Sequence, residues 1–131
     1  MVFDRTGIIL YTIKYKECVN FYADILELTI LFETDSLTCF AFGDAYLMVE
    51  LDTTNTSNNT AFSRIKTCLR MNVPDVKLMT EKLVAKNINV DYQEHSWGTI
   101  AKFFDPDGNL CAFKDRLKFE KQITDYKHHN R

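Results

Sequence analysis

The sequence lacks the features that would mark a membrane-bound, exported or nucleic-acid-binding protein. No segment approaches the roughly 20 consecutive apolar residues that a membrane-spanning helix needs. The first residues contain no apolar run of signal-peptide length. The formal net charge is −2 and no basic block occurs, so a nucleic-acid partner is not expected. We therefore expect a cytoplasmic protein with neither a membrane nor a nucleic acid as its partner.

Cysteine and histidine are few and scattered, which argues against a zinc-binding motif. The four cysteines lie far apart inside apolar runs, and no Cys-x-x-Cys pair occurs. This pattern is typical of reduced, buried thiols in a cytoplasmic protein. His95 is the only histidine away from the C-terminal end of the chain.

Glycine and proline are also scarce, with four and two copies, so the turns that they mark stand out. In the segment 105–109, Pro106 fixes φ and Gly108 accepts a positive φ between two apolar runs, which predicts a hairpin turn. The segment 52–60 contains no apolar residue, and its short polar side chains predict a loop or linker near the middle of the chain.

What the sequence does contain is one pattern of strands and a helix that occurs twice. Strands are predicted over 8–15, 29–34, 37–42 and 45–51, with a helix over 16–27. The second half predicts strands over 65–73, 88–92, 99–104 and 110–115. Its helix begins at Asp75 as a plausible N-cap and ends at Asn87. Each half is thus β-α-β-β-β, with an offset of roughly 61 residues between the halves.

The repeat predicts the domain organisation. The 131 residues, 46% of them hydrophobic, suit one domain with a core. Residues 1–115 would form it, with module 1 over 7–51, a polar linker over 52–62 and module 2 over 63–115. Residues 116–131 are a charged tail, either solvated and frayed or an extra helix that packs on the domain or on a second subunit.

Three segments carry a resemblance to a known superfamily. They are CVNFYADILELTILFE at 18–33, MNVPDVKLMTEKL at 71–83 and WGTIAKFFDPDGNL at 97–110. In this order and spacing they resemble the vicinal oxygen chelate superfamily, which includes glyoxalase I, bleomycin-resistance proteins and extradiol dioxygenases. The resemblance covers about residues 7–115. It implies an α+β fold of two βαβββ modules, with curved mixed sheets around a shared cavity, and often a homodimer.

The resemblance also implies where metal ligands would lie. The superfamily's enzymes hold a divalent metal with His, Gln or Glu at the start of each module's first strand and in the last strand. Here these positions hold Gly7, Cys68 and Ala112, while Glu50, or Met48 in another register, occupies the remaining one. Glycine and alanine offer no ligand atom, and at most two donors remain. We therefore expect no cofactor, no metal and no complete catalytic set.

Strand alternation then predicts which side chains line the cavity. If Gly7 faces inward, so do Tyr11 on the same strand, Met48 on a neighbouring strand and Arg70 in module 2. The opposite sets are almost wholly apolar, whereas the inward sets mix aromatic and charged residues, as a ligand pocket would. Phe40, Phe42, Tyr92 and Trp97 are predicted as further wall residues. The predicted ligand-binding residues are Tyr11, Phe40, Phe42, Tyr46, Met48, Glu50, Arg70 and Trp97.

Structural interpretations of the same residues remain open. Glu50 and Arg70 either bind a ligand, pair with each other or lie solvated at the cavity mouth. Cys68 is more readily a packing thiol than a nucleophile, since no neighbouring group in the sequence lowers its pKa. Trp97 either stacks on a ligand or caps the sheet.

The leading hypothesis is a metal-independent protein of the bleomycin-resistance type that binds a small molecule, such as an aromatic or charged toxic compound. Aromatic residues and Glu50 favour an organic cation, whereas Arg70 favours an anion. Whether the chain is an enzyme is open, although the metal-ligand positions favour the view that it is not. The alternatives are a metal-dependent lyase, isomerase or dioxygenase, and a collapsed cavity that serves protein association.

Overall fold

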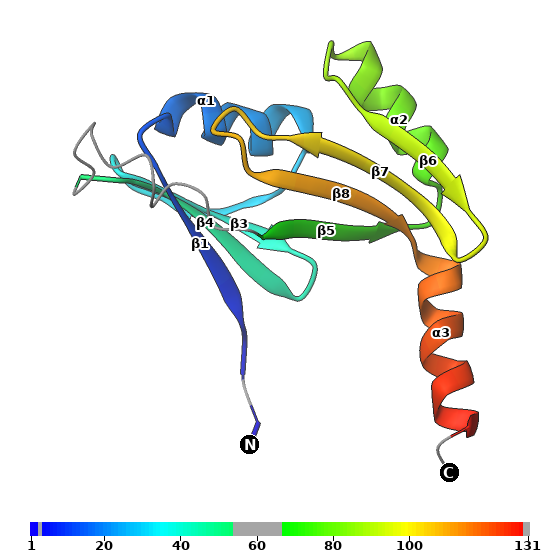
Figure 1. Cartoon of the computed structure of the whole chain (residues 1–131). Coiled ribbons are helices and arrows are strands. Elements are labelled where there is room, and N and C mark those ends of the chain that lie inside the picture. The colour runs from blue at the N-terminus through cyan, green and yellow to red at the C-terminus, as the bar shows by residue number, and fades with distance from the viewer. Residues whose placement is uncertain (3, 54–66, 130–131) are drawn as a thin grey trace. The chain divides into compact units, whose positions relative to one another are not determined.

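The computed structural model describes residues 1–2, 4–53 and 67–129 of the chain. They form two compact units, of which unit 1 contains Met1–Lys66 with Asp105–Asp107 and unit 2 contains Thr67–Phe104 with Gly108–Arg131. Each unit has one four-stranded mixed sheet and a helix after its first strand (Figure 1). The predicted α+β fold of two βαβββ modules is therefore confirmed. A cavity shared by the two sheets stays a prediction, and so does the division of the chain at residue 115.

Sheet A of unit 1 has the strand order β1-β4-β3-β2, with β1 and β4 parallel and the other neighbours antiparallel. Its strands are β1 (Gly7–Thr12), β2 (Ile30–Glu33), β3 (Leu37–Phe42) and β4 (Ala45–Leu51). The strand predicted over 8–15 ends early. The hydroxyl of Thr12 accepts a hydrogen bond from the Lys14 amide at 2.9 Å, and this turn leads the chain into the helix.

The helix of unit 1 begins as α1 (Tyr15–Asn20) and continues as a π-helical segment, η1 (Phe21–Ile25). The amide of Leu26 donates to the carbonyl of Phe21 at 3.0 Å, five residues back. Glu27 then takes a positive φ of 58°. The predicted helix over 16–27 is thus confirmed in place, although its second half is wound more widely than an α-helix.

Sheet B of unit 2 repeats this topology with the order β5-β8-β7-β6. Its strands are β5 (Cys68–Val73), β6 (Asp91–His95), β7 (Gly98–Phe104) and β8 (Leu110–Asp115), and its helix is α2 (Val76–Ala85). Asp75 is the N-cap, because its carboxylate accepts from the Leu78 amide at 3.0 Å. The predicted linker from residue 54 onward, and residues 65–66 of the predicted strand, lie outside the described residues.

The strand predicted over 88–92 is displaced to Asp91–His95. Asn87 has a positive φ of 63°, and the Ile88 amide donates to the Leu83 carbonyl, so residues 87–88 belong to the end of α2. The hairpin with β7, which pairs Asp91 with Lys102 and His95 with Gly98, sets where β6 lies. The apolar Ile88 belongs to the end of the helix, and the prediction that it begins the strand was wrong.

The C-terminal tail forms a helix, α3 (Arg116–His129), which extends beyond sheet B (Figure 1). The Asp115 carboxylate accepts from the Lys118 amide at 2.9 Å and from the Thr99 amide at 3.2 Å. These bonds hold the pKa of Asp115 below its usual value. Most α3 side chains are exposed, Leu117 and Tyr126 among them. No helix among the described residues is long and apolar enough to span a membrane.

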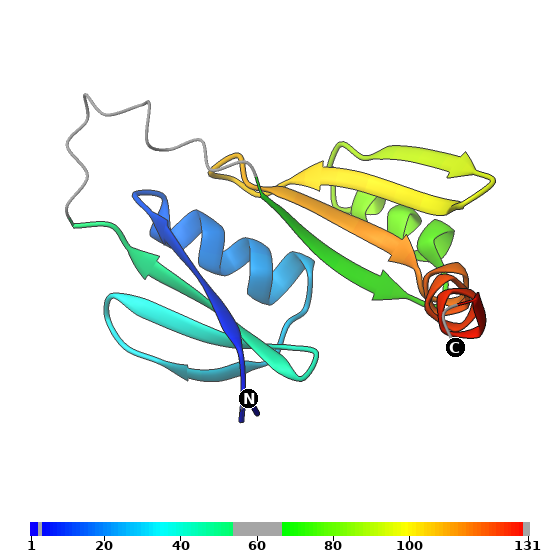
Figure 2. The same cartoon turned by 60° about the horizontal axis from the view of Figure 1, so that its bottom comes forward.

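Each sheet is covered by its helix on one face (Figure 2). In unit 1 this face is buried under α1 and η1, where the rings of Tyr22 and Phe40 lie 6.1 Å apart. In unit 2 the rings of Phe103 and Phe113 lie 5.0 Å apart and are both buried. The opposite faces, which we call the far face of sheet A and the far face of sheet B, carry the candidate functional residues.

Candidate functional site

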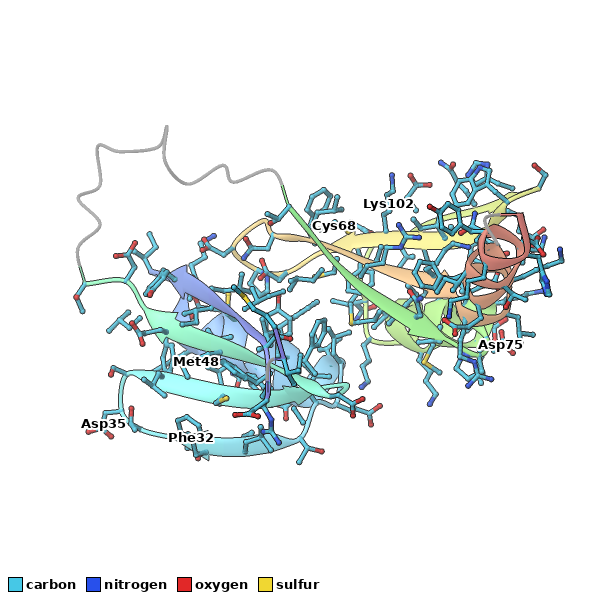
Figure 3. All side chains as sticks on the ribbon, turned by 90° about the horizontal axis from the view of Figure 1, so that it is seen from below. Phe32, Asp35, Met48, Cys68, Asp75 and Lys102 are labelled. Atoms are coloured by element: carbon cyan, nitrogen blue, oxygen red, sulfur yellow. The ribbon has the colours of Figure 1, made fainter. Side chains whose placement is uncertain are left out.

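The far face of sheet A carries alternate side chains of its strands. In register, Gly7 pairs with Tyr46, Ile9 with Met48, Tyr11 with Glu50 and Cys39 with Met48. A hollow of about 390 Å³ lies on this face and is lined by Arg5, Leu31, Phe32, Cys39, Tyr46 and Met48. Two of its lining residues, Phe32 and Met48, are labelled in Figure 3.

The ring of Tyr46 lies directly against Gly7 on this face. A Cβ atom built at Gly7 would overlap the ring of Tyr46, so only glycine allows the ring to lie over this strand position. This position is where the superfamily's enzymes would carry a metal ligand. In this chain an aromatic ring covers it, and the same ring forms one wall of the hollow.

The hollow contains one buried thiol, Cys39, and one positively charged side chain, Arg5. Cys39 is buried in sheet A, and its pKa is raised by desolvation and lowered to a smaller extent by the positive charge of Arg5. Arg5 is itself one of the residues that line the hollow. The hollow combines two aromatic rings, the thioether of Met48 and one cation.

Two of the predicted ligand-binding residues, Tyr46 and Met48, line the hollow. Tyr11 and Glu50 lie side by side further along the same face but do not line it. The structure corrects the placement of Phe40, which pairs with the fully buried Leu47 and is itself fully buried under the helix. Phe42 lies on that same covered face, two residues along β3. Neither of the two can be a wall of the far face.

The far face of sheet B is cationic where the far face of sheet A is apolar. In register, Ala112 lies between Arg70 on β5 and Lys102 on β7, so all three side chains share one face. Ala112 is fully buried, whereas Arg70 and Lys102 are exposed. Among residues 67–129, neither cation has a salt bridge or a hydrogen bond.

Cys68 lies beside these cations at the start of β5. Burial raises the pKa of its thiol, and the charges of Arg70 and Lys102 oppose that rise. Cys68 is therefore not an activated nucleophile. Figure 3 shows Cys68 at the start of β5 and Asp75 beyond the other end of that strand.

Trp97 lies in the turn between β6 and β7 at the edge of sheet B. Its ring stacks on that of His95 with centroids 4.5 Å apart, and the Lys114 ammonium lies 5.3 Å from the ring centroid. Lys114 is almost fully buried, donates to the Trp97 carbonyl at 3.4 Å and pairs with Asp115 at 3.9 Å. Gly98 leaves the space that the Lys114 side chain fills. Trp97 is 46% exposed, so the stack is open to solvent on one side.

Tyr92 is another predicted wall residue whose placement the structure corrects. It pairs with the fully buried Ala101, on the face that α2 covers. Its hydroxyl donates to the Glu94 carboxylate at 2.7 Å, and this bond raises the pKa of Tyr92. With Asp75 and Asp115 it lines a separate, acidic hollow of about 250 Å³ beside the start of α2.

The residues present do not fit the metal of the superfamily's enzymes. The Gly7 position is covered by the Tyr46 ring, and the Ala112 position lies between two cations that would repel a divalent ion. In the described ranges, no group of three His, Cys, Asp or Glu side chains is arranged to hold a metal. That the protein works without a metal remains a prediction. An ion pair between Glu50 and Arg70 would join the two units and likewise stays open.

Sequence reasoning missed Arg5, Phe32, Cys39 and Lys102. Lys102 alternates with the buried Ala101 and Phe103, so its face could have been inferred once the register of β7 was known. Phe32 follows a register shift between Ile30 and Phe32 in β2, which simple alternation cannot anticipate. Arg5 precedes the first strand and had no periodic signal.

Comparison with protein families and with solved structures agrees on the fold. The model of the glyoxalase-like domain family matches residues 6–118. No curated protein matches the chain.

A lactoylglutathione lyase from Agrobacterium tumefaciens superposes with a TM-score of 0.71 at 18% identity, covering 87% of this chain and 93% of that one. A protein of unknown function from Agrobacterium tumefaciens str. C58 gives 0.69 at 22% identity, covering 89% and 95%. UcmS2 gives 0.74 at 13% identity, covering 88% and 99%. At these identities the likeness shows a common fold.

Proposed function

The chain belongs to the glyoxalase-like domain family of the vicinal oxygen chelate superfamily, and from this premise we propose that it is a metal-independent protein of the bleomycin-resistance type that binds a small molecule. The observation that carries the proposal is the hollow on the far face of sheet A. Its volume of about 390 Å³ falls within the range of ligand pockets, which is about 300–1,000 Å³.

The lining of the hollow suits a ligand with a flat or apolar body. Phe32 and Tyr46 offer aromatic faces, and Met48 offers a polarisable thioether that adapts to irregular shapes. Arg5 can stack on an aromatic ligand or pair with an anionic group on it. Glu50, further along the face, would instead favour a positive group. Sequestering such a compound, as in antibiotic resistance, needs affinity only and no catalytic group.

The positions of the superfamily's metal ligands support binding without a metal. The Tyr46 ring over Gly7 excludes a ligand side chain there, and Ala112 supplies no donor. The alternative is a metal-dependent lyase, isomerase or dioxygenase of the same superfamily. It requires at least three donors around one metal ion. Metal analysis of the purified protein separates the two, since a near-stoichiometric metal content would favour the enzyme.

A thermal-shift screen with neutral, cationic and anionic aromatic compounds and with divalent metals tests the proposal. We expect an aromatic compound to raise the melting temperature. The variant Met48→Arg, which places a charge in the hollow, should lose this effect. Val84→Arg on the exposed side of α2 is the matched control and should keep it. Stabilisation by nickel, zinc, manganese or iron, and by no organic compound, would overturn the proposal.

We further propose that the protein is a cytoplasmic homodimer. The described cysteines are all free thiols, as a reducing compartment requires. The edge strand β1 exposes Ile8, Ile9 and Tyr11 by 43%, 41% and 59%, and association would remove this apolar surface from water. Light scattering coupled to gel filtration should give twice the mass of 15.3 kDa. A monomer at micromolar concentration would refute the dimer without affecting the binding proposal.

A further inference from the structure

The geometry points to an oxyanion-binding site on the far face of sheet B, made by Arg70 and Lys102 above Ala112, that takes the carboxylate or phosphate group of an organic compound. The residues of this site all belong to unit 2, and none of them lines the hollow on sheet A.

The register of three strands brings the two cations together. Arg70 and Lys102 are both paired with Ala112, from β5 and β7 on either side of β8. Neighbouring strands lie about 4.8 Å apart, so the two Cα atoms are roughly 10 Å apart with their side chains on one face. Ala112 is fully buried between the two long side chains, and a small anion would bind over it, between their cationic groups.

The charges of both cations are available to a ligand. Among residues 67–129, neither Arg70 nor Lys102 forms a salt bridge or a hydrogen bond. Asp91 lies opposite Lys102 in register and keeps its charge, but it forms no salt bridge with Lys102 within residues 67–129; its carboxylate accepts from the side-chain amide of Gln93 at 3.2 and 3.3 Å. Two like charges held side by side without a partner repel each other, and an oxyanion relieves this repulsion. A guanidinium can also bind such a group through two parallel hydrogen bonds.

Apolar side chains on the same face indicate that the anion is part of an organic molecule. On one side of Arg70 and Lys102, the next residues of this face are Phe104, Leu110 and Cys68, which lie next to one another across β7, β8 and β5. Phe104 is 61% exposed, so its ring is accessible to a ligand. At the other end, Trp97 stands open beside Lys114, which follows Ala112 on the same strand face. An aryl group on either side of the anion would find an aromatic partner.

Fluorescence titration can test the site, because Trp97 is the only tryptophan of the chain and lies at the edge of this face. The probes are phenyl phosphate, benzoate and inorganic phosphate, with benzylamine as the cationic counterpart. We expect saturable binding of phenyl phosphate and benzoate, weaker binding of inorganic phosphate and none of benzylamine. Binding should weaken as the salt concentration rises.

Matched variants assign the binding to the two residues. Arg70→Gln and Lys102→Gln should each weaken phenyl phosphate binding at least about tenfold. Lys82→Gln, the same change at an exposed position of α2, should leave it unchanged. Melting temperatures equal to that of the unchanged protein would show that the variants are folded.

Particular results would overturn the inference. Anion binding that survives both substitutions, or equal binding of benzylamine, would refute the site. Equal affinity for inorganic and phenyl phosphate would retain an oxyanion site and refute the organic ligand. Loss of phenyl phosphate binding in Met48→Arg, with binding retained in Arg70→Gln and Lys102→Gln, would assign it to the hollow on sheet A and refute the site on sheet B, so the two failures are distinguishable.

Discussion

Sheets A and B have the same strand order and a helix in the same place, yet their far faces differ in chemistry. On sheet A, apolar and aromatic side chains surround a hollow that one arginine borders. On sheet B, two exposed cations flank an alanine. The covered faces, in contrast, are both apolar and buried. The repeat therefore preserves what folding requires and leaves each far face free to acquire its own binding chemistry.

The largest expected effect is on the free energy of unfolding, which should fall far more when a ring is removed from a covered face than from a far face. Phe40→Ala and Phe103→Ala remove fully buried rings and should each lower the free energy of unfolding by about 3–5 kcal/mol. Phe32→Ala and Phe104→Ala remove half-exposed rings of the far faces and should each cost about 1 kcal/mol or less. Urea unfolding measures all four. Equal costs for Phe40→Ala and Phe32→Ala in unit 1, or for Phe103→Ala and Phe104→Ala in unit 2, would contradict the assignment of faces.

A second change restores the carboxylate that the superfamily's enzymes carry in the last strand. In Ala112→Glu, the new side chain would lie between Arg70 and Lys102 and occupy the proposed oxyanion site from within. We expect phenyl phosphate binding to fall about tenfold, which corresponds to about 1.4 kcal/mol. Ala112→Ser, which is small and uncharged, is the control and should bind almost normally. Undiminished binding in Ala112→Glu would show that the anion binds elsewhere.

A third change concerns Asp115, whose carboxylate caps α3 and pairs with the buried Lys114. Asp115→Ala should lower the free energy of unfolding by about 1 kcal/mol at pH 7. The pKa of Asp115 is lowered in the folded state from the ordinary 3.8. Its contribution is therefore complete above that value and is lost as the pH falls through the folded-state pKa. We would measure the free energy of unfolding of the variant and of the parent at pH 7 and near pH 3. The difference between the two proteins should be smaller at the lower pH.

The smallest effect should arise at Gly7. In Gly7→Ala, the new methyl group must displace the Tyr46 ring, which can swing aside at a cost of roughly 1 kcal/mol. The displacement would also reshape the hollow and weaken the binding of an aromatic ligand. In the double variant with Tyr46→Ala, the stability cost of Gly7→Ala should vanish. A cost that persists in the double variant would mean that Gly7 is required for a reason other than the ring.

Part of this structure follows from local patterns in the chain. Asp75 was predicted as an N-cap and its carboxylate does accept from the Leu78 amide. Alternation along β4 correctly separated the buried Leu47 and Val49 from Tyr46 and Met48. These predictions succeeded because a cap and the alternation of a strand depend only on a few neighbouring residues.

The sequence by itself determined that each module would have one apolar, helix-covered face and that no metal-ligand side chain would stand at Gly7 or Ala112. Only the tertiary structure decided that Phe40 falls on the covered face and that Arg70 and Lys102 lie on either side of Ala112. The physical reason is register. Alternation is a property of one strand, whereas the face and the neighbours of a residue depend on the pairing of strands distant in sequence.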